Sequence, residues 1–227
     1  MSKKNIYYRD FNAQRYSQSW RITPAEQVRV DIILKLAGKN VKILDVGCYD
    51  GSIAEFLKRN GNKVFGIDSS LEAMKLTKAK GIDCIKGDIN EEITFIRDNS
   101  FDIVLAAEVI EHVLNPGDFI EQAKRILKKG GTLILTTPNL ASLGRRLYLL
   151  FGRNPLIEIG IDDGEAGHIR YFVKDTLCGL LKKYDFAIKV FCSDVVNFDN
   201  SGNHFFKLLA KVFPGLGKTL IVKAVKQ

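Results

Sequence analysis

Short apolar runs alternate with amphipathic segments along most of the chain. Each apolar run has the length of a buried strand, and each amphipathic segment repeats its apolar positions with a helical period. The predicted strands lie at residues 41–47, 63–68, 82–88, 101–108 and 131–139. The predicted helices between them lie at residues 52–60, 70–80 and 118–129. This alternation is typical of βαβ units, so the sequence predicts an α/β protein with a doubly wound, mostly parallel sheet and helices on both faces.

Further elements flank this series. A helix is predicted before the first strand, with Thr23 as its N-cap, Pro24 at its first position and Gly38 at its end. After the fifth strand the rhythm changes, because residues 139–168 are longer than an ordinary connection between elements. The pattern then resumes with a helix at 173–184 and with strands at 186–194 and 218–226.

The composition is that of a soluble globular protein, since 46% of the 227 residues are hydrophobic and 26% are charged. Charges interrupt the apolar stretches before they reach the roughly 18 residues of a membrane span, and the N-terminus lacks the apolar segment of a secretory signal. The four cysteines show no C-x-x-C spacing, so we expect reduced thiols and a cytoplasmic location. The net charge of +8 suits an anionic substrate, a membrane surface or RNA, and is also typical of a solvated face.

A glycine-containing turn follows the first predicted strand, in the stretch "LDVGCYDG". Gly47 and Gly51 lack the side chain that would hinder a tight turn or keep a ligand away from the backbone. Ligands of open parallel sheets bind at such strand ends. The dinucleotide fingerprint G-x-G-x-x-G is not met, because Tyr49 and Ser52 stand where its second and third glycines belong. The turn therefore indicates a nucleoside cofactor other than a dinucleotide.

Carboxylates gather at the same strand ends. Asp68 ends the second strand about 20 residues after the turn, where nucleoside-binding folds place an acid on the ribose hydroxyls. Asp88 ends the third strand, and Asp45 and Asp50 stand in the turn itself. So much negative charge would repel a pyrophosphate and attract a cationic sulfonium that also carries an ammonium group.

Five motifs together resemble those of the class I S-adenosylmethionine-dependent methyltransferases. "LDVGCYDG", "GIDSS", "GDI", "FDIVLAAEVIEHV" and "LKKGGTLILTTPN" occur in the family's order and spacing and cover residues 41–140. "GHIRYFVKDTLCGLLKKYDF" extends the resemblance further along the chain. The resemblance implies a Rossmann-like, seven-stranded sheet whose last strand is antiparallel, with S-adenosylmethionine as the cofactor.

The resemblance also implies roles for individual residues. Asp45 would orient the turn through hydrogen bonds to backbone N–H groups. The family has glycine where Tyr49 stands, and a bulky side chain there would shield the cofactor or weaken its binding. The remaining implied cofactor residues are Gly47, Cys48 and Gly51 for the methionine part, Asp68 for the ribose, Asp88 for the adenine amino group, Ser69 and Ile89 beside the adenosine, and Ala107 or Glu108 beside the methyl group.

A second constellation follows the fourth strand. If the residues after Ala107 are helical, Glu108, Glu111 and His112 share one helix face. "EVIEHV" is shared with methyltransferases similar to the ubiquinone-biosynthesis O-methyltransferase, and related RNA 2′-O-methyltransferases hold Mg²⁺ with two such glutamates, the histidine and a later histidine. His168 in "GHIRYF" fits that later position. Three roles stay open: a divalent-metal site made by these four residues, a general base at His112 or His168, and a purely structural cluster.

The chain is predicted to form one methyltransferase domain over residues 1–227. Residues 1–40 would supply an N-terminal cap and helix, 41–140 the cofactor-binding core, and 141–170 and 195–217 the substrate-side insertions. In the cap, Tyr8, Arg9 and Tyr16 could close over the cofactor or pack on the sheet edge. The insertions contain two short basic amphipathic stretches, 142–155 and 204–215, which could dock on anionic lipid or cover a substrate pocket.

These features favour an S-adenosylmethionine-dependent methyltransferase that methylates an oxygen of a small-molecule, glycan or lipid-linked acceptor. "TTPN" after the fifth strand differs from the Asn/Asp-Pro-Pro-Tyr/Phe signature of enzymes that methylate nucleic-acid amino groups, which argues against nucleic-acid bases as acceptors. The alternatives are an RNA 2′-O-methyltransferase with a Glu/His metal site and a non-catalytic protein that binds the nucleoside cofactor.

Overall fold

The computed structural model describes residues 22–158, 167–197 and 205–227. Its strands are β1 (Lys42–Val46), β2 (Lys63–Asp68), β3 (Asp83–Lys86), β4 (Phe101–Ala107), β5 (Leu127–Pro138), β6 (Phe186–Ser193), β7 (Val196–Asn197), β8 (Phe205–Phe206) and β9 (Thr219–Lys226). The α-helices are α2 (Pro24–Ala37), α3 (Ser52–Arg59), α4 (Leu71–Ala79), α5 (Pro116–Ile126), α6 (Leu143–Leu150), α7 (Lys174–Lys183) and α8 (Lys207–Val212). Two short 3-10 turns, η1 (Ile110–His112) and η2 (Pro214–Leu216), accompany them.

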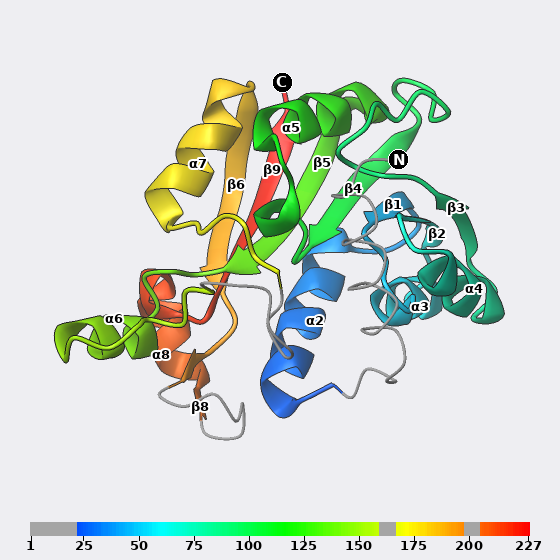
Figure 1. Cartoon of the computed structure of the whole chain (residues 1–227). Helices are drawn as coiled ribbons and strands as arrows, with labels where there is room; N and C mark the ends of the chain where they lie inside the picture. The colour runs from blue at the N-terminus through cyan, green and yellow to red at the C-terminus, as the bar shows by residue number, and fades with distance from the viewer. Residues whose placement is uncertain (1–21, 159–166, 198–204) are drawn as a thin grey trace, which may run out of the picture.

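One 7-stranded sheet dominates the structure, with the strand order β3-β2-β1-β4-β5-β9-β6 (Figure 1). β1 pairs in parallel with both β2 and β4, and the parallel pairing continues to β3 and to β5. β9 inserts between β5 and β6 and runs antiparallel to both. The predicted fold class, a doubly wound sheet with an antiparallel last strand, is confirmed.

Both faces of the sheet are buried, because consecutive strand residues point to opposite faces and both find helices to pack on. On one face Ile43 and Ile103 pack with α2 and α3 in a common apolar cluster. On the other face Leu44 and Val104 pack with α5 and α7 in a larger cluster. This arrangement explains why the strands read as nearly continuous apolar runs.

Helix α2 begins as the sequence predicts. Thr23 is the N-cap and accepts the backbone N–H of Glu26, while the Glu26 carboxylate accepts the backbone N–H of Thr23 in return. Pro24 occupies the first turn, where its missing N–H costs nothing, and Gly38 follows the last helical residue.

The helix predicted at 118–129 and the helical spacing considered after Ala107 differ in the structure. α5 ends at Ile126, three residues early, because Leu127 already pairs with Phe101 of β4. Residues 108–112, which the structure describes, do not form an α-helix after β4. Glu108 has a positive φ of 58°, and the 3-10 turn η1 forms after it. The helical spacing that would have aligned Glu108 with Glu111 on one face is therefore absent.

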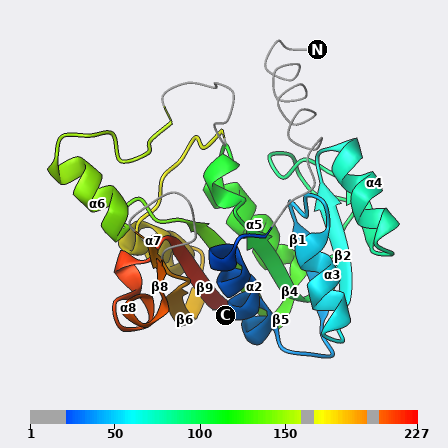
Figure 2. The same ribbon diagram turned by 90° about the horizontal axis from the view of Figure 1, so that it is seen from below.

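The late half of the chain builds structure beyond the carboxyl ends of the strands. α6 follows β5, while β7, β8 and α8 lie between β6 and β9. Figure 1 and Figure 2 both show α6 and α8 together at the end of the molecule that is far from α4. The N-terminal residues predicted to cap the cofactor, Tyr8, Arg9 and Tyr16, lie outside the described residues.

All four cysteines are free thiols, as predicted. Among the helices of the described ranges, none has the length and apolar character required to cross a bilayer.

Candidate active site

The carboxyl ends of four parallel strands meet at one edge of the sheet. Val46, the last residue of β1, stands beside Ile67 of β2 and Ala106 of β4, and Asp68 stands beside Lys86 of β3. The predicted cofactor residues all occupy these strand ends or the turns that follow them: Asp45, Gly47, Cys48, Gly51, Asp68, Ser69, Asp88, Ile89, Ala107 and Glu108.

Both glycines of the first turn are structurally required. Gly47 and Gly51 have φ angles of 67° and 74°, which lie in the left-handed region that side chains disfavour. A Cβ atom on Gly47 would stand 2.7 Å from Cγ2 of Val109, and one on Gly51 would stand 2.9 Å from Cα of Thr77. The glycines thus allow η1 and α4 to pack directly against the turn.

Backbone groups and Asp68 hold this turn in place. The N–H groups of Gly47 and Cys48 both donate to the carbonyl of Ile67, at 2.8 and 3.2 Å. The N–H of Tyr49 donates to the Asp68 carboxylate at 3.0 Å. The prediction that Asp45 holds these N–H groups is therefore wrong, since Asp68 and the neighbouring strand do so.

Asp45 is instead a deeply buried carboxyl group. The residue is 2% exposed, and its Oδ2 atom makes no hydrogen bond with any described residue. Burial, helped by the negative charges of Asp68, Cys84 and Asp50, raises the pKa of Asp45 to about 8. A positively charged ligand at this edge would supply the hydrogen-bond donor and the compensating charge that the buried carboxylate lacks. The site therefore fits a cationic sulfonium nucleoside with an ammonium group.

The other predicted nucleoside residues lie in two turns. Asp68 is buried and also accepts the N–H of Ser70, at 2.9 Å, while Ser69 between the strand and the helix is exposed. Asp88 is exposed and accepts both the backbone and the side-chain N–H of Asn90. Ile89 is partly buried against the apolar cluster of the α5 face.

Tyr49 has a φ of 51°, so its backbone adopts the conformation that glycine favours. This observation explains why the resembled family has glycine at the position. The turn keeps its shape with tyrosine, because the Tyr49 N–H is held by Asp68 and the Tyr49 carbonyl accepts the Thr77 hydroxyl at 3.3 Å.

Cys48, predicted beside the methionine part, is buried with its side chain turned to the sheet. Its Sγ lies 3.5 Å from Sγ of Cys84 and 3.5 Å from the hydroxyl of Thr77. The hydrogen bond with Cys84, together with burial, raises the pKa of Cys48. The residue is an unreactive thiol, so only its backbone is placed to border a ligand.

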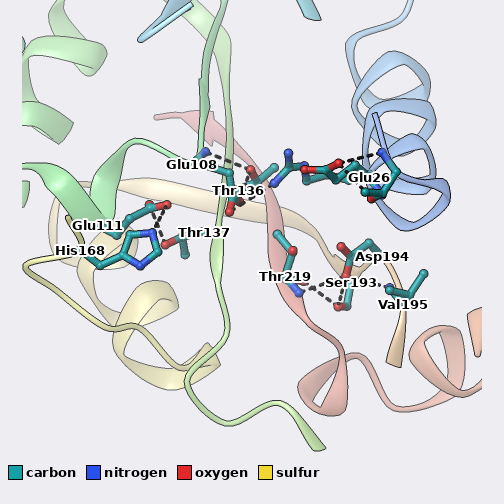
Figure 3. A network of polar contacts seen from close by, with 12 residues as sticks. Glu26, Glu108, Glu111, Thr136, Thr137, His168, Ser193, Asp194, Val195 and Thr219 are labelled. Carbon is teal, nitrogen blue, oxygen red and sulfur yellow. Dashed lines mark hydrogen bonds and ion pairs between the residues drawn. The ribbon is translucent and has the colours of Figure 1, made fainter. Parts of the chain in front are cut away.

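Glu108 and Glu111 diverge at the end of β4, as Figure 3 shows. The Glu108 carboxylate accepts the Thr136 hydroxyl at 2.8 Å and pairs with Arg29 of α2 at 3.2 Å. The Glu111 carboxylate is 1% exposed and accepts the Thr137 hydroxyl at 2.9 Å. Burial, and next the charge of Glu108, raises the pKa of Glu111 well above its ordinary value. Its Oε1 atom makes no hydrogen bond within the described ranges.

The two predicted histidines lie beside Glu111. Their ring centroids are 4.9 Å apart, and Nε2 of His168 lies 3.9 Å from Oε1 of Glu111. Nδ1 of His112 lies 3.1 Å from the Gly167 carbonyl, and Nδ1 of His168 lies 2.8 Å from the Glu158 carboxylate. Because carbonyl and ionised carboxylate oxygens only accept, both Nδ1 atoms carry protons, and a neutral ring keeps its lone pair at Nε2.

The structure thus brings together three of the four predicted metal ligands. Glu111, His112 and His168 offer ligand atoms that all lie within 4.8 Å of one another. Histidines that ligate metals typically donate the other N–H to a carbonyl or carboxylate, which is the arrangement seen here. Glu108 is not in this group, because it is turned toward Arg29 and Thr136.

Three residues of the site were not predicted. Arg29 is a buried partner for Glu108, and Glu158 orients His168 through both its ring and its backbone N–H. Arg145 of α6 stands over the ring of Tyr171, and burial lowers its pKa. No periodic pattern marks these residues, because Arg29 and Arg145 come from segments far from their partners in the chain and Glu158 lies in an irregular connection before His168.

Comparison with known proteins agrees with this geometry. The sequence profile of a family described as "Methyltransferase domain" matches residues 18–189. The ubiquinone biosynthesis O-methyltransferase of Pelagibacter ubique is 31% identical over 173 residues, which are 72% of this chain and 69% of that enzyme. The human mitochondrial enzyme of the same name is 37% identical over 123 residues, which are 49% of this chain and 32% of that protein. The chain therefore spans about a third to two thirds of the length of such relatives.

Solved structures share the fold. A methyltransferase of Thermotoga maritima, described as a possible histamine N-methyltransferase, superposes with a TM-score of 0.66 at 21% identity, covering 99% of this chain and 96% of that one. A methyltransferase of Methanosarcina mazei gives a TM-score of 0.63 at 21% identity, covering 86% and 96%. Both structures are described as dependent on S-adenosylmethionine.

Proposed function

Because this chain belongs to the methyltransferase-domain family, we propose that it transfers the methyl group of S-adenosylmethionine to a hydroxyl oxygen of a small-molecule acceptor. Glycans and lipid-linked compounds fall within this class. The names of the relatives, ubiquinone biosynthesis O-methyltransferases, favour a phenolic hydroxyl as the first acceptor to test.

The cofactor end of the proposal is supported by the buried Asp45. Its Oδ2 atom, which no described residue binds, belongs to the next-to-last residue of β1, just before the turn that the family uses for the methionine part of the cofactor. Ionised Asp45 would attract the positive charge of that part, while Asp68 at the end of β2 and Asp88 after β3 lie at the same edge, where the nucleoside would bind. S-Adenosylmethionine supplies an already activated methyl group, so the protein mainly needs to align the acceptor oxygen with it.

The observation that carries O-methylation is the pair of histidines beside a buried glutamate. A hydroxyl must lose its proton as it attacks, and Nε2 of His168 or of His112 is the atom that would accept it. The Glu158 carboxylate, 2.8 Å from Nδ1 of His168, would stabilise the resulting imidazolium. The acceptor oxygen, once freed of its proton, would be ready to receive the methyl group that S-adenosylmethionine supplies when bound.

The donor set also fits a divalent metal ion. One carboxylate oxygen from Glu111 and one imidazole nitrogen from each histidine lie close enough to share a cation. When bound, such an ion would lower the pKa of a coordinated hydroxyl. Glu158 and the Gly167 carbonyl would orient the two rings in either case.

Two measurements test the proposal. Titration calorimetry should detect binding of S-adenosylhomocysteine, and transfer of a tritiated methyl group to a panel of phenols, sugars and lipid-linked alcohols should identify the acceptor. Total RNA in the same panel distinguishes 2′-O-methylation. If the protein binds the nucleoside but transfers the methyl group only to a nitrogen acceptor, O-methylation is contradicted. If it does not bind the nucleoside, the use of S-adenosylmethionine is contradicted.

Histidine variants separate the roles of the cluster. We expect His168→Ala and His112→Ala to lower kcat by about 10²- to 10⁴-fold, the usual contribution of a general base, and to leave nucleoside affinity unchanged. Loss of activity with EDTA, restored by Mn²⁺ or Zn²⁺, would assign a metal, and full activity in both variants would leave only a structural role.

A further inference from the structure

Two cysteine sulfur atoms lie in contact beside the turn of the candidate cofactor site. Sγ of Cys48 and Sγ of Cys84 are 3.5 Å apart, and the two residues are 5% and 3% exposed. Cys48 follows β1 and Cys84 lies in β3, so the fold brings them together across β2 and α4. Both are free thiols, and the structure therefore shows the pair in its reduced form.

Gly66 of β2 provides the space that the two sulfur atoms share. It stands beside Cys84 in the pairing of β2 with β3. A Cβ atom on Gly66 would stand 2.8 Å from Sγ of Cys48 and 3.2 Å from Sγ of Cys84. Glycine within a strand often marks a place where another group approaches the backbone closely. Here it allows both thiols to occupy the same small volume.

The two thiols differ in their reactivity toward an oxidant. The hydrogen bond between them lowers the pKa of Cys84, whereas the same bond and burial raise the pKa of Cys48. The thiolate is the form that attacks a peroxide, so Cys84 is the thiol that is oxidised first. β3 is an edge strand of the 7-stranded sheet, and local opening of this edge would let a molecule as small as hydrogen peroxide reach Cys84.

We propose that hydrogen peroxide converts Cys48 and Cys84 into a reversible disulfide that displaces the cofactor turn. In the first step the Cys84 thiolate attacks a peroxide oxygen, the O–O bond breaks, and a sulfenic acid forms as hydroxide leaves. In the second step the Cys48 sulfur attacks the Cys84 sulfur, the S–O bond breaks, and the Cys48 proton leaves with the hydroxyl group as water. The contact between the sulfur atoms makes this attack intramolecular, which offsets the low reactivity of the Cys48 thiol.

The disulfide would move the turn because Cys48 belongs to it. Sulfur atoms of a disulfide lie about 2 Å apart, which is closer than the 3.5 Å of the reduced pair. Cys84 lies within a paired strand, so the approach would fall mainly on Cys48. The Cys48 N–H donates to the Ile67 carbonyl, and the Cys48 carbonyl accepts the Gly51 N–H. A shift of Cys48 therefore disturbs the bonds that shape the turn.

The expected effect on ligand binding rests on the proposed cofactor site, whereas the disulfide and the displacement of the turn do not. Oxidation should lower the affinity for S-adenosylhomocysteine at least about tenfold, within the usual range of coupling between two sites. Because such coupling is reciprocal, bound S-adenosylhomocysteine should disfavour the disulfide in a glutathione redox buffer by the same factor.

Peptide mapping of the full chain tests for the bond. Trypsin cleaves after lysine and arginine, so it releases Cys48 within residues 43–58 and Cys84 within residues 81–86. After peroxide treatment we expect a linked peptide that lacks two hydrogens relative to the sum of its parts and that separates with dithiothreitol. Amide hydrogen exchange within residues 43–58 should increase in the linked protein, which reports the turn without any ligand.

Serine variants supply the controls. Cys84→Ser should bind the nucleoside like the reduced wild type and should not respond to peroxide, and Cys84→Ala repeats the test without a buried hydroxyl. Cys192→Ser is the matched control, because it removes a half-buried thiol from β6 and should leave the response to peroxide intact. Circular dichroism verifies the folding of each variant.

Three results would overturn the proposal. The first is wild-type protein that forms no linked peptide with peroxide, including the case in which Cys84 becomes a sulfinic acid instead. The second is a linked protein whose hydrogen exchange in residues 43–58 is unchanged. The third is a linked protein that binds S-adenosylhomocysteine like the reduced one. If the reduced wild type does not bind this nucleoside, the proposed function fails, while the peptide map and the exchange still decide whether the disulfide forms and moves the turn.

Discussion

Asp45 allows a quantitative test of the candidate cofactor site. The side chain is buried, no described residue binds its Oδ2 atom, and its pKa is raised from the ordinary 3.8 to about 8. In the folded protein it is therefore mostly protonated at pH 7, whereas in the unfolded chain it is ionised. Asp45→Asn replaces the neutral acid with an amide of the same shape that never ionises.

The size of the effect follows from linkage. In the unfolded chain Asp45 has its ordinary pKa of 3.8, which is about 3 units below pH 7. Keeping the side chain protonated in the folded protein at pH 7 therefore costs about 4 kcal/mol. The folded state binds the extra proton, so this penalty is absent below about pH 4 and grows as the pH rises toward 8. Asp45→Asn should therefore raise Tm at pH 7 by up to about 10 °C and have little effect at pH 4.

Thermal unfolding of both proteins between pH 4 and 8.5, without ligand, measures this difference. Asp83→Asn is the control, because Asp83 is exposed at the start of β3. In calorimetry, Asp45→Asn should bind S-adenosylhomocysteine at least about tenfold more weakly, because the carboxylate that would meet the ammonium group is gone. Wild-type affinity should rise as the pH rises through 8. A stability difference that does not change with pH would refute the reasoning.

Three further variants test other contacts of the site by chemical denaturation. Tyr49→Gly should leave the free energy of unfolding within about 1 kcal/mol of wild type, since relief of the left-handed backbone offsets the added freedom of the unfolded chain, and a loss well above this would contradict that balance. Gly51→Ala should cost about 2 kcal/mol or more because its Cβ would meet the backbone of Thr77, whereas Gly130→Ala, with open space around it, should cost only about 1 kcal/mol of strain. Arg29→Met should cost about 2 kcal/mol by leaving Glu108 without its ion partner, and a loss in the double variant Arg29→Met/Glu108→Gln equal to the sum of the two single losses would show that the pair is not coupled.

The position of the candidate cofactor residues at the strand ends was largely predictable from the sequence. Apolar runs mark the strands of a parallel sheet, so the sequence pattern alone assigns Asp68 and Asp88 to the same edge. The helix N-cap at Thr23 was equally readable, because a capping box is a local signal. What the pattern could not show was the bonding of Asp45, since the amides that it was expected to hold donate to Ile67 and Asp68 on the next strand.

For the acceptor side of the site, the sequence indicated which residues belong to the cluster but not how they contact one another. The spacing of Glu108, Glu111 and His112 suggested a shared helix face, but a left-handed residue at 108 sends the two carboxylates to different partners. His168 was placed correctly beside Glu111, whereas its partner Glu158 was missed. Contacts between residues far apart in sequence leave no periodic signal, so tertiary packing decided them.

The position of β9 has a consequence for synthesis on the ribosome. Among the described strands, β9 alone joins β6 to the large sheet, although residues 194–218 must be translated between the two. During translation β6 is made before β9, the strand with which it pairs, so β6 and the helix α7 that packs on it cannot join the sheet at once. β1 to β5 can already assemble at this stage. Nascent chains arrested before residue 219 should therefore expose the edge of β5 to chaperones and proteases.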